Sequence, residues 1–195
     1  MIVVGLTGGI GSGKTTIAKY FESFGIPIYI ADKEAKALMN RSKVIKRKLV
    51  ELFGPSAYKK NELNREYLAS KIFSDKSLLS KMNAIVHPKV ASHFKRWLKK
   101  QKAPYVIKEA AIIFENNLEY QYDYIITVTA DKDLRIERVM RRDDVSAEKV
   151  KSIIRNQLSD KEKVEKSDFI IENNDLETSK KQAQEIHQNI LKKIS

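Results

Sequence analysis

The sequence contains no cysteine, and it has only four prolines, seven glycines and one tryptophan among its 195 residues. The absence of cysteine excludes a disulfide framework and any cysteine-ligated metal site, and it is consistent with a reducing compartment. The chain also lacks an apolar run of the roughly 20 residues that a membrane helix needs. Its first residues lack the basic and apolar regions of a signal peptide. We therefore expect a cytoplasmic protein with no membrane partner.

Acidic residues are scarce in one long segment of the chain. Residues 33–102 contain 19 lysines and arginines but only 5 aspartates and glutamates, whereas the remaining residues contain 18 basic and 20 acidic side chains. The formal net charge of +12 therefore comes from this segment. Most of these lysines are expected on a solvated surface, but a field of this kind attracts polyanions. Charge alone does not decide between a phosphorylated small molecule and nucleic acid.

Apolar runs alternate with helical patterns along the rest of the chain. The pattern predicts strands at residues 1–7, 26–32, 104–114, 122–130 and 167–173. It predicts helices at residues 13–24, 131–142, 146–158 and from about 176 onward. This alternation is typical of an α/β fold of three layers, with a parallel sheet and helices on both faces. Residues 33–102 have a helical pattern too long for a simple crossover, so we expect a helical insertion there.

Glycine, although rare, is concentrated near the N-terminus. Four of the seven glycines lie within residues 8–13, and residues 8–15 match the G-x-x-x-x-G-K-[ST] pattern between a predicted strand and a predicted helix. Glycines allow successive backbone N–H groups to converge on a phosphate, and the following helix adds the positive end of its dipole. The pattern predicts a nucleotide site formed by Gly9, Gly11, Ser12, Gly13, Lys14, Thr15 and Thr16. In it, Lys14 reaches the β- and γ-phosphates and the Thr15 hydroxyl ligates Mg²⁺.

A phosphate-binding loop of this kind is compatible with several functions. The sequence lacks the two motifs of a GTPase. No D-x-x-G motif follows the loop, because neither Gly25 nor Gly54 has an aspartate three residues before it, and no N-K-x-D motif is present. The chain is short for a motor ATPase or a helicase. A small-molecule kinase remains, acting for example on nucleoside monophosphates, as does a regulator or ATPase that binds nucleic acid. The basic segment lacks regular aromatic interleaving, so we expect no nucleic-acid partner.

Seven segments together resemble the dephospho-CoA kinase family along nearly the whole chain. They are GLTGGIGSGKTT (5–16), IAD (30–32), NAIVHPKV (83–90), IIFENNLEYQYDYIITV (112–128), RIERVMRRDD (135–144), IIRNQ (153–157) and SDFIIENN (167–174). The resemblance implies a P-loop kinase that uses ATP and Mg²⁺ to phosphorylate the ribose 3′-hydroxyl of dephospho-CoA, the last step of coenzyme A synthesis. We leave the oligomeric state open but expect a monomer.

The resemblance also implies that the chain has three parts. At two positions, however, the sequence departs from the family pattern. The parts are a nucleotide-binding core (1–32, 103–130 and 159–195), a helical CoA-binding insertion (33–102) and a lid (131–158). The family's Asp-Ala-Asp is Ile-Ala-Asp here, which leaves Asp32 as the second carboxylate. The family's aspartate followed by Pro-Leu-Leu corresponds here to Glu109 and the Ala-Ile-Ile at 111–113.

Three residues are candidates for the acceptor side of the site. Asp32 follows a predicted strand, where a carboxylate either caps the next helix or takes the proton of the attacking hydroxyl. Glu109 is expected at the end of the third strand, either as a polar residue leaving the sheet or as a ligand of Mg²⁺ or substrate. His87 precedes Pro88, which is expected to break the helix. By periodicity His87 is a packing residue, whereas the resemblance implies that it lines the acceptor pocket.

Four residues near the C-terminal half are candidates for the nucleotide side. The arginines of 135–142 form a solvated basic face or supply cations to the transferring phosphoryl group. Within RRDD, Arg142 matches the family best, so the resemblance implies that it is the catalytic arginine, and Arg138 is the second choice as a nucleotide contact. Gln157 is expected to face the same site as a substrate contact. Asn173 follows the fifth strand as either an adenine contact or a turn residue.

Overall fold

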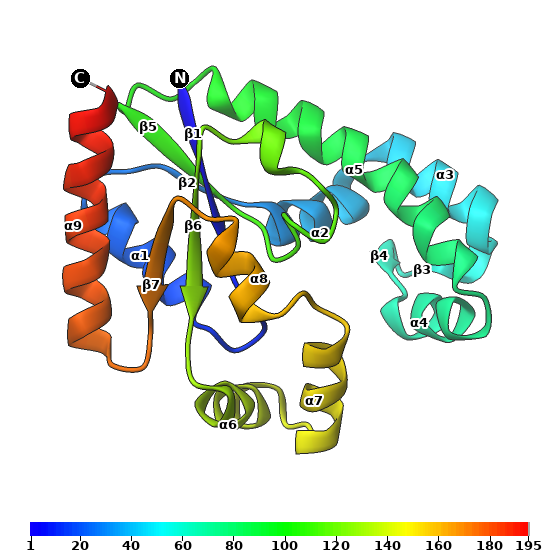
Figure 1. Cartoon of the computed structure of the whole chain (residues 1–195). Coiled ribbons are helices and arrows are strands. Elements are labelled where there is room, and N and C mark those ends of the chain that lie inside the picture. The colour runs from blue at the N-terminus through cyan, green and yellow to red at the C-terminus, as the bar shows by residue number, and fades with distance from the viewer. Residues whose placement is uncertain (195) are drawn as a thin grey trace. The chain divides into compact units, whose positions relative to one another are not determined.

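The computed structural model describes residues 1–194, and its central feature is a parallel five-stranded sheet (Figure 1). The strands lie in the order β2-β5-β1-β6-β7. Their bounds are β1 (Ile2–Thr7), β2 (Ile28–Ile30), β5 (Tyr105–Glu109), β6 (Tyr124–Thr129) and β7 (Phe169–Glu172). The central strands read as nearly continuous apolar runs because both of their faces are buried. The predicted α/β fold with a parallel sheet is confirmed.

Helices cover the sheet because alternate residues of each strand need apolar partners on opposite faces. The helices associated with the sheet are α1 (Lys14–Ser23), α6 (Lys132–Asp143), α7 (Ala147–Arg155), α8 (Asp160–Glu165) and α9 (Leu176–Ile194), with the short η2 (Glu119–Gln121). On one face, α1 and α9 lie side by side (Figure 1), and Ile126 belongs to the core that they form. On the other, Ile125 packs with Ile113 and Phe114. The sheet is thus filled on both sides.

The chain divides into two compact units, and the second comprises Ala31–Lys100. The first contains residues 1–30 and the chain from Gln101 onward. The second unit is built from α2 (Ala31–Arg41), α3 (Lys43–Phe53), η1 (Pro55–Ala57), β3 (Tyr58–Lys59), β4 (Glu62–Leu63), α4 (Arg65–Ser74) and α5 (Ser77–Leu98). Helix α5 packs with α2, α3 and α4 inside this unit. The predicted roles of the insertion and of the lid stay predictions.

Some predicted boundaries are wrong for identifiable reasons. The third strand ends at Glu109 rather than at residue 114, because the chain turns there and the apolar residues that follow pack on the sheet instead of extending it. The helix predicted at 146–158 ends at Arg155, and α8 begins anew with a capping box between Ser159 and Glu162. Pro88 lies inside α5 without ending it, because the helix is held by buried side chains on both sides of the proline.

Candidate active site

The glycine-rich loop joins the central strand β1 to α1, at the carboxyl edge of the sheet. Gly8, Gly11 and Gly13 have φ values of 148°, 77° and 89°, which lie in the region that side chains disfavour. No side chain caps the N-terminus of α1, and its first turn contains no acidic residue. An uncapped helix N-terminus of this kind suits an anion, because the helix dipole favours a negative charge at this position.

Lysine and hydroxyl groups complete the loop. Lys14 Nζ donates to the carbonyl oxygens of Gly8 at 2.8 Å and Gly9 at 3.2 Å, so its ammonium arches back over the loop. Thr15, in the first turn of α1, is exposed. Ser12 Oγ is buried and has no hydrogen-bond partner within residues 1–194. A buried hydroxyl of this kind suits an oxyanion, because an unmade hydrogen bond is costly.

Close protein contacts also require glycine in this loop. A Cβ atom on Gly9 would lie 2.1 Å from Arg135 Nη2, and one on Gly11 would lie 2.5 Å from the backbone oxygen of Arg135. A Cβ atom on Gly13 would lie 2.0 Å from Asn173 Nδ2. The sequence pattern accounts for these glycines by the approach of a phosphate alone. The structure adds that α6 and the end of β7 pack directly against the loop.

Glu109 lies where the prediction placed it along the third strand. It is the last residue of β5, and its register partners are Leu6 of β1 and Ile30 of β2. The next residue, Ala110, donates its N–H to the carbonyl oxygen of Leu6 at 3.1 Å. Only 8% of Glu109 is exposed. Its carboxylate therefore belongs to the same edge of the sheet from which the glycine-rich loop begins.

Asp32 and His87 belong to the second unit. Asp32 is the second residue of α2, so it lies inside the first turn rather than at the capping position before it. An acidic side chain there is favoured by the helix dipole. His87 is exposed on α5, so the packing role that its periodicity suggested is wrong. Within residues 1–194 no group of three or more metal-binding side chains occurs.

Three residues that are predicted to contact the nucleotide or the substrate form hydrogen bonds within the protein that connect them to the loop. Asn173 is 2% exposed, and its Nδ2 donates to the Ser12 carbonyl oxygen at 2.8 Å. Arg138 Nη1 donates to the Asn173 carbonyl oxygen at 2.9 Å. Gln157 Oε1 accepts the N–H of Ile10 at 2.9 Å. The structure thus brings these residues to the loop as its supports, and their contacts with ligands stay predictions.

Arg142 lies on α6 one turn beyond Arg138 and faces solvent. Its side chain is 64% exposed, and its Nε and Nη2 atoms each donate to a carboxylate oxygen of Asp143 at 2.8 Å. This hydrogen-bonded pair raises the pKa of Arg142 and lowers the pKa of Asp143. The structure does not bring Arg142 to the glycine-rich loop, and its catalytic role stays a prediction.

The sequence pattern assigns Arg135 no role distinct from that of the other arginines of α6, although the structure places it against the loop. It is 3% exposed, its Nε donates to the Ile10 carbonyl oxygen at 2.8 Å, and its guanidinium pairs with Asp160. One signal was available in the sequence. Arg135 is four residues before Val139, on the apolar side of an otherwise charged helix. A cation at such a position requires a buried partner.

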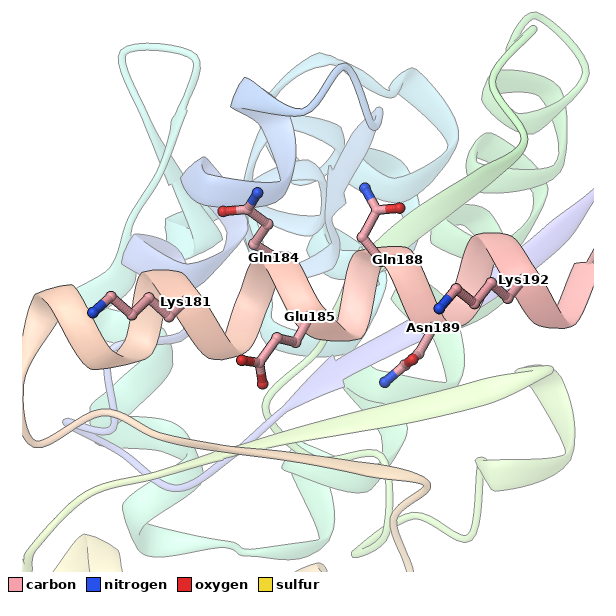
Figure 2. A pocket seen from close by; sticks show the side chains of 6 residues that line it. All are labelled: Lys181, Gln184, Glu185, Gln188, Asn189 and Lys192. Atoms are coloured by element: carbon pink, nitrogen blue, oxygen red, sulfur yellow. The ribbon is translucent and has the colours of Figure 1, made fainter.

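A shallow polar hollow runs along the exposed side of α9 (Figure 2). Its lining residues are Lys181, Gln184, Glu185, Gln188, Asn189 and Lys192. It contains none of the predicted site residues and does not mark the active site.

Known proteins resemble this chain over almost its whole length. The family model described as dephospho-CoA kinase matches residues 2–178. The dephospho-CoA kinase of Bacteroides fragilis YCH46 is 38% identical over 173 residues, which cover 88% of this chain and 84% of that protein. The solved structure of Thermus thermophilus TT1252 superposes with a TM-score of 0.89 at 32% identity, covering 97% of both chains. The dephospho-CoA kinase of Campylobacter jejuni gives 0.72 at 25% identity, covering 99% and 98% of the two chains.

Proposed function

Because the chain belongs to the dephospho-CoA kinase family, we propose that it transfers the γ-phosphoryl group of ATP to the ribose 3′-hydroxyl of dephospho-CoA. The product is coenzyme A, and the reaction is the final step of its synthesis. The observation that carries this proposal is the glycine-rich loop between the central strand and the uncapped N-terminus of α1. Phosphoryl transfer depends mainly on positioning and on neutralising charge, which such a loop supplies.

The residues of the loop fit ATP together with Mg²⁺. Backbone N–H groups of the loop and of the first turn of α1, other than the Ile10 N–H that Gln157 binds, hold the phosphates, and Lys14 exchanges its carbonyl partners for phosphate oxygens. The Thr15 hydroxyl and the Glu109 carboxylate are oxygen donors of the kind that Mg²⁺ takes, and Mg²⁺ commonly uses few protein ligands beside nucleotide phosphates. When bound, Mg²⁺ neutralises charge on the phosphates. Alternatively, the Glu109 carboxylate contacts the acceptor instead of Mg²⁺.

The acceptor is bound, in this proposal, by residues of the second unit. The basic excess of residues 33–102 attracts the diphosphate of dephospho-CoA, and His87 lines its pocket. Asp32 accepts the proton of the 3′-hydroxyl while that oxygen forms a bond to the γ-phosphorus and ADP leaves. The position of Asp32 two residues after β2 supports this role, because ligands of open α/β sheets bind beyond the carboxyl ends of the strands.

Closure of residues 131–158 is proposed to bring cations to the transferring group. Arg142 would leave Asp143 and contact the γ-phosphoryl group, with Arg138 beside it. For Gln157, whose Oε1 accepts the Ile10 N–H, contact with the acceptor is one alternative and support of the loop is the other. An exposed ion pair contributes only about 0–1 kcal/mol, so breaking the pair of Arg142 and Asp143 costs little. Closure also excludes water, which would otherwise accept the phosphoryl group and waste ATP.

Asp32→Asn tests the proposed base. We expect this variant to fold and to bind ATP with unchanged affinity, and its kcat to fall by roughly 10²- to 10⁴-fold. The matched control is Glu66→Gln, which removes an exposed carboxylate from α4 of the same unit. A kcat near that of the unchanged enzyme would remove Asp32 from the reaction.

A panel of acceptors tests the reaction itself. Purified protein with ATP and Mg²⁺ is expected to release ADP rapidly with dephospho-CoA and not with nucleoside monophosphates or DNA. DNA-stimulated hydrolysis without transfer to a small acceptor would contradict the proposal. His87→Ala is expected to raise the KM for dephospho-CoA, and an unchanged KM would argue against its place in the pocket.

Location and assembly complete the proposal. None of the helices in residues 1–194 has the length and apolar character needed to span a membrane. We place the enzyme in the cytoplasm, as a monomer that acts on a small molecule without nucleic acid. Light scattering of the purified protein at micromolar concentration tests the monomer, and the DNA arm of the acceptor panel tests the absence of a nucleic-acid partner.

A further inference from the structure

The tip of the glycine-rich loop is attached to the α6–α7 region by three separate contacts. The carbonyl oxygen of Ile10 accepts from Arg135 Nε at 2.8 Å, and its N–H donates to Gln157 Oε1 at 2.9 Å. The side chain of Ile10 packs against a buried apolar cluster formed by Ile136, Val139 and Val150. The backbone N–H and C=O groups of Ile10 and the side chain between them are therefore held by residues at least 125 positions away.

Arg135 is itself fixed in place by its surroundings. Its guanidinium pairs with Asp160, the first residue of α8, and the residue is only 3% exposed. A charge this buried is costly unless its hydrogen bonds are made, so its orientation is tightly constrained. Arg135 also occupies the space beside Gly9 that any side chain at that position would need. The guanidinium thus packs directly against the loop at Gly9 and restricts its conformation.

We propose that Arg135 and Gln157 are positioning residues for the nucleotide, acting through the backbone of Ile10. By holding Ile10 from both sides, they keep the N–H groups that follow it directed toward the position of the phosphates before ATP arrives. A loop that is already ordered loses less conformational freedom on binding, so the affinity for ATP rises. The inference rests on the proposed use of ATP, but it assigns to Gln157 a support of the loop rather than a contact with the acceptor.

A second consequence concerns the segment expected to close over the nucleotide. Arg135 and Gln157 lie near the two ends of residues 131–158, and both are bonded to the loop. Ile136, Val139 and Val150 of the same segment also pack with Ile10, so a closure that brings Arg142 to the γ-phosphoryl group has to keep these contacts with the loop.

Gln157→Met tests the proposal, because methionine keeps the length of the side chain and removes the acceptor. The ATP dissociation constant, measured by calorimetry, is expected to rise roughly tenfold, as for a lost hydrogen bond to a backbone group. The KM for dephospho-CoA is expected to stay within twofold. The control is Gln184→Met, which makes the same change on the exposed side of α9 (Figure 2). Unchanged ATP affinity, or a raised KM for dephospho-CoA, would overturn the proposal.

Arg135→Lys supplies an independent arm. Lysine keeps a cation for Asp160 but loses the Nε donor to Ile10, so we again expect weaker ATP binding. Since both residues hold the backbone of Ile10, the double variant should weaken ATP binding by less than the product of the two single effects. Multiplied effects would show independent roles and contradict a shared action through Ile10. If Arg135→Lys does not fold, Gln157→Met decides alone. Absence of ATP binding by the unchanged enzyme would refute the proposed function instead.

Discussion

Replacing Asn173 by alanine distinguishes a support of the glycine-rich loop from a contact with adenine. In the structure, the Asn173 side-chain amide donates to the Ser12 carbonyl oxygen and accepts from Ser179 Oγ at 2.9 Å. The residue is 2% exposed, and its Nδ2 occupies the position that a Cβ of Gly13 would need. If the Asn173 side chain holds the loop, its loss must lower the free energy of unfolding even when no nucleotide is present.

The expected size follows from the groups left behind. Ser179 Oγ keeps a second partner, the Asp175 carbonyl oxygen at 2.5 Å, so it is not left without a hydrogen bond. The Ser12 carbonyl loses the amide of Asn173, and a buried polar group left unsatisfied costs about 1–3 kcal/mol. We therefore expect Asn173→Ala to lower the free energy of unfolding by about 2 kcal/mol. Asn173→Asp should cost more, because it places a buried carboxylate oxygen against a carbonyl oxygen.

Urea unfolding of the nucleotide-free protein, followed by circular dichroism, measures this difference. The control is Asn189→Ala on the exposed side of α9, which should stay within about 0.5 kcal/mol of the unchanged protein. Binding of ATP and GTP is then compared for each variant. Unchanged stability of Asn173→Ala together with a lost preference for ATP over GTP would refute the reasoning and would favour the adenine contact.

Three further predictions concern pH, a buried ion pair and the glycine-rich loop. Burial lowers the pKa of His187, whose Nδ1 lies 2.7 Å from the Tyr105 hydroxyl oxygen. Below pH 6.5 the unfolded chain then binds more protons than the folded chain, so the unfolding temperature should fall as the pH drops, and less so in His187→Gln. Lys163 is fully buried and lies 2.7 Å from the carboxylate of Glu115. Lys163→Met should cost about 3–5 kcal/mol in urea unfolding, partly recovered by adding Glu115→Gln, and full stability of the single variant would contradict this. Gly11→Ala, at φ 77° and with its Cβ 2.5 Å from a backbone oxygen of α6, should weaken ATP binding in calorimetry by more than about tenfold, whereas unchanged binding would show that the loop tolerates the methyl group.

The sequence alone determined the features that depend on short spacings. The glycine-rich loop is a local pattern, and Lys14 and Thr15 follow it within one turn of helix, so their positions depend on little else. The parallel sheet followed from apolar runs that alternate with helical segments. The third strand was predicted too long because Ile113 and Phe114 are buried without being extended, and an apolar residue signals burial more surely than backbone conformation.

Only the tertiary structure decided which side chains support the loop. Asn173 is 161 residues from Ser12, and Gln157 is 147 residues from Ile10, yet each pair forms a hydrogen bond. These contacts exist because β1 lies at the centre of the sheet, so that segments following β6 and β7 return to the edge where the loop begins. The spacing of residues along the chain does not predict these long-range contacts. The sequence therefore determined what the loop is built to hold, and the arrangement of the strands decided what holds the loop.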